Sequence, residues 1–132
     1  MTPPVDRPVD RLRALCLALP EVTERLSHGE PTWFVRGRKV FVQLSDHHHD
    51  DRAGFWCAAV ADVRDSLVGR DPERFFVPPY VGGRGWLGVY LDSETRGGAP
   101  PDWDEIDELV REAFRLVAPK TLAARLDAPA EG

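Results

Sequence analysis

Three positively charged side chains stand together at Arg36, Arg38 and Lys39, around a single glycine, Gly37. Guanidinium and ammonium groups are the side chains with which proteins commonly contact the phosphates of a nucleic acid. A tight turn that projects such groups together can lie along a groove of the duplex, although the same charges also keep an exposed sheet edge soluble. The cluster therefore gives two hypotheses, a phosphate contact and a solubilising turn.

The sequence His47-His48-His49-Asp50-Asp51 has the composition of a metal site. In an extended segment His47, His49 and Asp51 would point to one side, because side chains alternate along a strand. Two imidazoles and one carboxylate can hold a divalent metal on one face and leave positions open for a substrate. A solvated loop is the interpretation we favour, because loops run over the protein surface. A metal-dependent enzyme is the second alternative function.

Residues 75–86 combine aromatic rings with two prolines and three glycines, which is dense for an ordinary connection. Prolines fix φ and glycines allow close backbone approach, so the composition predicts a shaped surface. We favour a segment that plugs the core of a sheet, with Trp86 covered. The first alternative function is a groove that binds a small ligand or an anion through His28, Tyr80 and Trp86, with Arg84 supplying charge.

Residues 83–88 match the GxGxxG pattern of dinucleotide-binding proteins letter for letter. That site needs a strand before the glycines and a helix after them, so that helix N–H groups face the pyrophosphate. A strand is predicted to follow here, and we reject the match. His28 and Glu30 are similar to a general acid–base pair, but no nucleophile motif accompanies them in the sequence. We therefore expect a binding protein rather than an enzyme, and no cofactor.

The charge of the chain is unevenly placed. The formal net charge is −5, yet from Asp92 to Glu112 eight acids face two bases, while residues 1–91 balance to zero. An acidic total argues against a strongly electrostatic nucleic-acid binder, but acids gathered on one helix leave room for a basic face elsewhere. Cys16 and Cys57 lack the spacing of a zinc motif and are predicted to be small buried hydrophobes.

Apolar patterning predicts the elements that position these groups. Helices are predicted at residues 9–19, 63–69, 106–117 and 122–126, and strands at residues 33–35, 39–44, 55–59 and 87–91. Asp102 and Glu105 have the spacing of a capping box, and Gly37 suits the first central position of a type II′ hairpin turn. Helices at both ends and hairpin-connected strands between them favour an α+β fold, an antiparallel sheet with helices packed on one face.

The length of 132 residues suits one domain spanning residues 1–132. The longest apolar runs are far below the roughly 20 residues of a membrane span. Asp6 and Asp10 stand where a signal peptide would need an apolar stretch. We therefore expect a cytoplasmic protein that makes no membrane contact, and the sequence leaves its oligomeric state open.

Several of these segments resemble the MmcQ/YjbR-like family. The matching segments are Leu17-Ala18-Leu19-Pro20-Glu21-Val22, His28-Gly29-Glu30-Pro31, residues 33–41, residues 71–82, Gly85-Trp86 and Leu91-Asp92. The likeness covers about residues 9–118 and leaves residues 119–132 as a C-terminal extension. It implies a small CyaY-like domain of a kind often described as DNA-binding, with a wing-like basic hairpin at Arg36, Arg38 and Lys39. We expect weak, sequence-tolerant DNA binding in which this hairpin and Arg84 contact phosphates.

Overall fold

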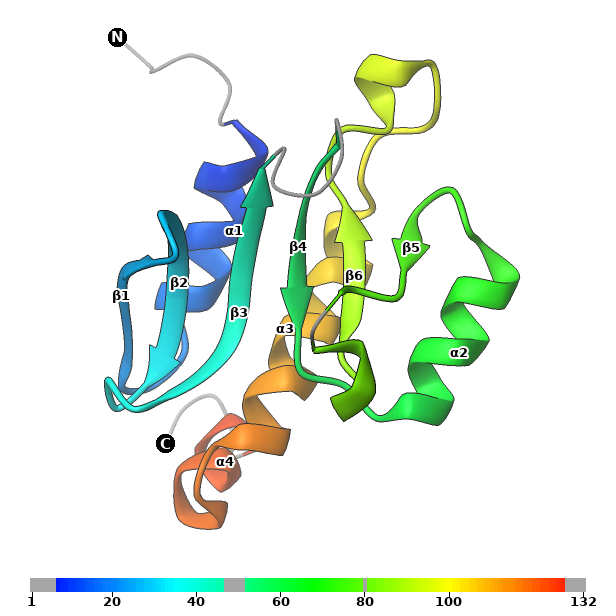
Figure 1. Ribbon diagram of the computed structural model, residues 1–132. Helices are drawn as coiled ribbons and strands as arrows, with labels where there is room; N and C mark the ends of the chain where they lie inside the picture. Colours follow the sequence, from blue (N-terminus) through cyan, green and yellow to red (C-terminus); the bar gives the residue numbers. More distant parts are fainter. Residues whose placement is uncertain (1–6, 47–51, 80, 128–132) are drawn as a thin grey trace, which may run out of the picture.

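The computed structural model describes residues 7–46, 52–79 and 81–127, and it contains one six-stranded sheet (Figure 1). The strands lie in the order β1-β2-β3-β4-β6-β5, and every neighbouring pair is antiparallel. Their bounds are β1 Val22–Ser27, β2 Glu30–Val35, β3 Lys39–Asp46, β4 Ala53–Cys57, β5 Phe75–Phe76 and β6 Leu87–Tyr90. The antiparallel sheet predicted from the sequence is confirmed.

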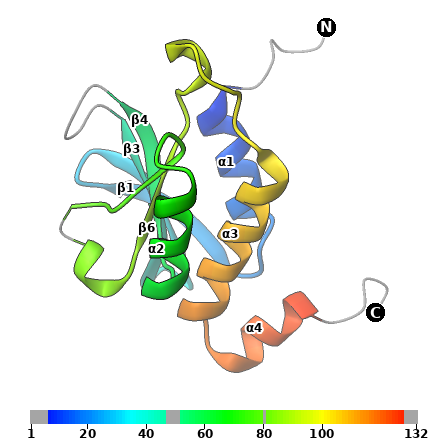
Figure 2. The ribbon, with the colours of Figure 1, turned by 90° about the vertical axis from the view of Figure 1, so that its right-hand side faces the viewer.

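Four α-helices accompany the sheet within the described residues. They are α1 Pro8–Leu17, α2 Ala61–Arg70, α3 Trp103–Val117 and α4 Lys120–Asp127, and two short 3₁₀ turns are η1 Gly82–Arg84 and η2 Glu94–Arg96. Helices α1 and α3 lie together on one face of the sheet (Figure 2), which confirms the predicted α+β fold. Helix α2 lies beside the β5 edge (Figure 1). Among the described residues, no helix is long and apolar enough to cross a membrane.

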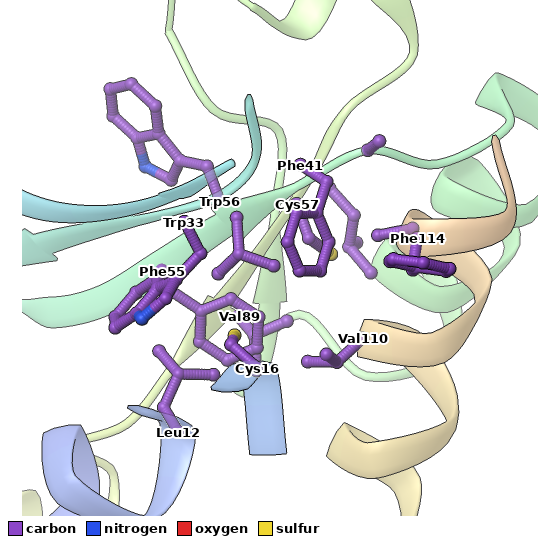
Figure 3. Close-up of a cluster of buried hydrophobic side chains, with 14 of the residues drawn as sticks. Leu12, Cys16, Trp33, Phe41, Phe55, Trp56, Cys57, Val89, Val110 and Phe114 are labelled. Atoms are coloured by element: carbon purple, nitrogen blue, oxygen red, sulfur yellow. The ribbon is translucent and has the colours of Figure 1, made fainter. Parts of the chain in front are cut away.

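The core lies between the sheet and the helices α1 and α3 (Figure 3). The apolar stripe of α3 faces the sheet, and Phe114 packs edge-to-face against Phe41 with ring centroids 5.8 Å apart. Cys16 and Cys57 are both buried in this core, as predicted. Burial of these side chains removes apolar surface from water and is the main term that holds α3 in place.

The predicted capping box at the start of α3 is half formed. Asp102 accepts a hydrogen bond from the Glu105 backbone N–H at 3.1 Å, which satisfies one of the free donors of the first helical turn. The Glu105 carboxylate does not return the bond, because it accepts from Arg70 at 3.2 Å and from Arg74. Helix α2 and the segment leading to β5 are thereby linked to α3.

Strand β1 was not predicted, and its polar sequence explains why. Side chains at Thr23 and Arg25 are exposed, while the alternate position Glu24 points inward. Glu24 accepts hydrogen bonds from Arg13 Nε at 2.8 Å and from Trp33 Nε1 at 3.0 Å. A strand whose inward position is a carboxylate shows no apolar alternation in its sequence. The extended conformation of β1 is set by its pairing with β2.

The segment of aromatic, proline and glycine residues forms the edge strand β5 and buries two of its rings in the core, in agreement with the core plug favoured from the sequence. Phe75 is 1% exposed and Trp86 7% exposed. The Phe76 ring stacks on Tyr90 at 4.5 Å and lies directly over Gly88, where a Cβ would collide with it. Strand β6 follows the glycines, which agrees with rejecting a dinucleotide site. Tyr80 lies outside the described residues.

The turn between β2 and β3 has a different type from the one predicted. The Arg38 N–H donates to the Val35 carbonyl at 3.0 Å, so Arg36 and Gly37 are the two central residues. Both have positive φ, +56° and +67°, which is the signature of a type I′ turn and not of type II′. The type I′ turn matches the twist of the strands, and the extra residue Arg38 is accommodated before Lys39 pairs with Val35.

Candidate nucleic-acid interface

The β2–β3 turn, the junction of α3 with α4 and the end of η1 with the residues that follow it surround a hollow at one end of the domain. One part, about 530 Å³, is lined by Val35, Arg36, Arg38, Lys39, Leu116, Val117, Ala118, Pro119 and Lys120. The adjoining part, about 420 Å³, is lined by Arg38, Lys39, Val40, Arg84, Trp86, Leu116 and Val117. Because four residues line both parts, they form one continuous surface, which we call the basic groove. Figure 1 shows the β2–β3 turn and the α3–α4 junction at the same end of the molecule.

Local backbone geometry places each cation on the rim of the basic groove. The type I′ turn projects Arg38, and Arg25 fixes the turn from β1 by donating to the Gly37 carbonyl at 3.0 Å. On the opposite rim, Gly85 has φ +90° and lies close to the backbone of Ala61. A Cβ added at Gly85 would lie only 3.0 Å from the Ala61 nitrogen. This tight approach leaves Arg84 exposed while the next side chain, Trp86, turns into the protein.

Four cations of the basic groove have no acidic partner within the described part of the chain. Arg38, Lys39, Arg84 and Lys120 are exposed, and none of them forms an ion pair with a described acid. No acid is among the described residues that line either part of the groove. Unneutralised cations that share a concave surface attract a polyanion.

Arg36, the fifth cation of the groove, does have an acidic partner. Its Nε lies 2.8 Å from Glu21, and the same carboxylate lies 3.4 Å from Arg125 of α4. The structure therefore places Arg36 on the predicted surface but pairs its charge. The hydrogen bond from Arg36 lowers the pKa of Glu21 below its ordinary value, and the charge of Arg125 contributes less to the same shift.

The backbone at the α3–α4 junction adds little net charge. Helix α3 ends at Val117 and α4 begins at Lys120, so a carboxyl-terminal and an amino-terminal helix end meet at one point. Their partial charges have opposite sign and largely offset each other. The side chains therefore set the sign of the potential here, and Lys120 makes it positive.

Most acids of the helix α3, which the sequence predicted to be acidic, lie away from the basic groove, although the last turn of the helix lines it. The fifteen residues of α3 extend about 22 Å, and most of its acids lie toward the end far from the groove. Several of these acids are also paired: Glu105 with Arg70 and Arg74, Asp107 with Arg111 at 3.2 Å, and Glu112 with Arg115 at 2.8 Å. The acidic total of the chain thus does not oppose a local basic surface.

The remaining predicted residues do not join this surface. His28 lies in the β1–β2 turn, at the other end of β2 and about 20 Å along the strand from Arg36. Trp86 contributes to the lining of the groove, but without His28 beside it. His47, His49 and Asp51 lie outside the described residues, among which no three His, Cys, Asp or Glu side chains are grouped to hold a metal.

Lys120 is the cation of the groove that the sequence did not reveal. It stands alone after Pro119, and no cluster of charges marks it. Leu116, on the last turn of α3, was counted in no apolar stripe; it is 49% exposed and lines the groove. In the sequence, these two residues were marked only by their position at the end of a predicted helix that must pack on the sheet.

Comparison with known proteins agrees with this architecture. The model of the YjbR family matches residues 17–116, and the chain therefore belongs to that family, as its motifs predicted. The structure is similar to the crystal structure of the Deinococcus radiodurans protein DR2400, which carries the family-model domain DUF419. The TM-score is 0.68 at 17% identity, over 92% of this chain and 88% of that chain, a likeness that shows the fold alone. The comparison with curated proteins finds no match.

Proposed function

We propose that the protein binds DNA through the basic groove, by contacts to backbone phosphates. The observation that carries the proposal is the convergence of Arg38, Lys39, Arg84 and Lys120, from three separate segments, without an acidic partner in the described chain. When cationic side chains contact phosphates, counterions that had condensed on the DNA are released, and this release dominates the non-specific affinity. Phosphate contacts fix position but carry no sequence information, so the binding is weak and tolerant of sequence.

Two arginines in matched surroundings provide the test. Arg84 and Arg96 each end a 3₁₀ turn, each is exposed, and each precedes a glycine with φ near +90°. Arg84 lines the basic groove, whereas Arg96 lies on η2 at the other end of the molecule (Figure 1). Arg84→Ala should weaken binding of a short fluorophore-labelled duplex at low salt, measured by fluorescence anisotropy, while Arg96→Ala leaves it unchanged.

Stability provides the control for this comparison. Substitution of an exposed side chain with no described partner should change the free energy of unfolding by no more than about 0.5 kcal/mol in either variant. Equal weakening by the two variants would assign the binding to overall charge rather than to the groove. Failure of the wild-type protein to bind either duplex or single-stranded DNA at low salt would reject the proposed function.

A small anionic ligand in the same groove is the second candidate. The part beside Arg84 and Trp86, about 420 Å³, is within the size range of small-molecule sites, and its lining includes the apolar side chains of Val40 and Val117. These side chains would suit the body of a ligand whose anionic group meets Arg38 or Arg84. Saturable stabilisation against heat by a small organic phosphate, at a constant ionic strength and without DNA binding, would favour this candidate over the first.

A further inference from the structure

Glu21 is the one described acid that lies beside the basic groove and is bonded to one of its cations. It occupies the connection between α1 and β1 and has φ +58°, and Arg36 on the neighbouring turn has φ +56°. The Arg36 backbone N–H donates to the Glu21 carbonyl at 2.8 Å, in addition to the ion pair between their side chains. The backbone bond holds the two residues together, so the carboxylate and the guanidinium meet with little further loss of freedom.

We propose that Glu21 limits the affinity of the basic groove for DNA, because its carboxylate forms ion pairs with Arg36 and with Arg125. This inference rests on the proposed DNA-binding function and adds to it the residue that regulates its strength. A phosphate that approaches Arg36 must compete with a carboxylate 2.8 Å from the guanidinium. Arg38, Lys39, Arg84 and Lys120 face no such competition from a described acid.

The contact is well suited to such control because it is exposed. Glu21 and Arg36 side chains keep 44% and 47% of their surface accessible, and exposed ion pairs contribute only about 0–1 kcal/mol to stability. Removing the carboxylate therefore costs the fold little but gives the groove one more available cation. By counterion release, one further phosphate contact should steepen the slope of log affinity against log salt by about 0.9.

The experiment compares two substitutions that change the net charge equally. Glu21→Gln removes the acid beside the groove, and Asp107→Asn removes an acid that is also paired with an arginine, at 3.2 Å from Arg111. Asp107 lies about 14 Å along α3 from the groove, beyond the screening length of about 8 Å at physiological salt. Binding of a labelled mixed-sequence duplex is measured over a series of salt concentrations. Glu21→Gln should bind more tightly and with a slope about 0.9 steeper than both Asp107→Asn and the wild type.

A double-mutant cycle shows whether the gain comes from Arg36. Arg36→Ala should leave the slope of the wild-type protein nearly unchanged, because its charge is already matched by Glu21. In the Glu21→Gln background, Arg36→Ala should remove the increase of about 0.9 in the slope of log affinity against log salt. Glu21→Gly is a second variant without the carboxylate, and glycine tolerates the positive φ at this position.

The possible failures can be told apart. If wild type binds but Glu21→Gln and Asp107→Asn have the same slope, the role of Glu21 is wrong and the proposed function survives. If Arg36→Ala flattens the wild-type slope by a full contact, Arg36 is already available to DNA and the inference is again overturned. If no variant binds DNA, both the proposed function and this inference fall.

Discussion

The salt dependence of DNA binding gives the most direct measure of the basic groove. Four exposed cations without a described acidic partner line it, Arg38, Lys39, Arg84 and Lys120. If each neutralises one phosphate, the slope of log affinity against log salt should be about −3.6 for duplex DNA. Affinity should then fall about 150-fold between about 50 and 200 mM monovalent salt.

Arg38→Ala is the substitution that tests this value most cleanly. The turn is closed by the Arg38 backbone N–H, so removal of the side chain keeps the hairpin. The slope should become about −2.7, and the loss of affinity over the same salt range should shrink to about 40-fold. Arg96→Ala, at the other end of the molecule, should leave the slope at its wild-type value.

The measurement is an anisotropy titration of a labelled duplex at four or more salt concentrations, with far-ultraviolet circular dichroism to show that each variant is folded. A wild-type slope near zero would refute the electrostatic reasoning even if binding occurred. A normal wild-type slope that Arg38→Ala leaves unchanged would move the contact surface away from the β2–β3 turn.

Three further predictions concern packing and burial. Phe114→Ala should lower the free energy of unfolding by about 3–5 kcal/mol in urea denaturation, because the ring is fully buried against Phe41, and an unchanged midpoint would reject this packing. Gly88→Ala should destabilise by about 1–3 kcal/mol, because the new methyl group meets the Phe76 ring; thermal unfolding at the wild-type temperature would contradict the close contact. Burial raises the pKa of Cys57 from 9.0 to about 12, so the thiol should resist an aromatic disulfide reagent at pH 8 until the protein unfolds. Because the folded state disfavours the Cys57 thiolate, Cys57 should lower the free energy of unfolding progressively above about pH 9. A free energy of unfolding that rises from about pH 9 to 11 in the wild type, relative to Cys57→Ala, would contradict this expectation.

Much of the fold could be predicted because local patterns report burial. The stripe of α3 and the cap at Asp102 were readable from spacing, since a helix on a core must bury one face and must satisfy its first N–H groups. The covered Trp86 and the basic turn at Arg36 and Arg38 were likewise predicted from composition. The finer turn type was wrong, because Gly37 fits more than one hairpin geometry and the pairing of β2 with β3 selects among them.

The candidate site depended on contacts that no local pattern contains. Lys120 and Arg84 come beside the β2–β3 turn only because α3 packs across the sheet and Gly85, directly after η1, packs against Ala61. The pairing of Arg36 with Glu21 likewise joins residues on two connections that the sheet brings together. The sequence by itself determined the helices, the basic turn and the strands β2, β3, β4 and β6, because those properties follow from neighbouring side chains, whereas the polar segment β1 is extended only through its pairing with β2. Tertiary structure alone decided which charges are neutralised and which converge, because that depends on how the helices and strands pack.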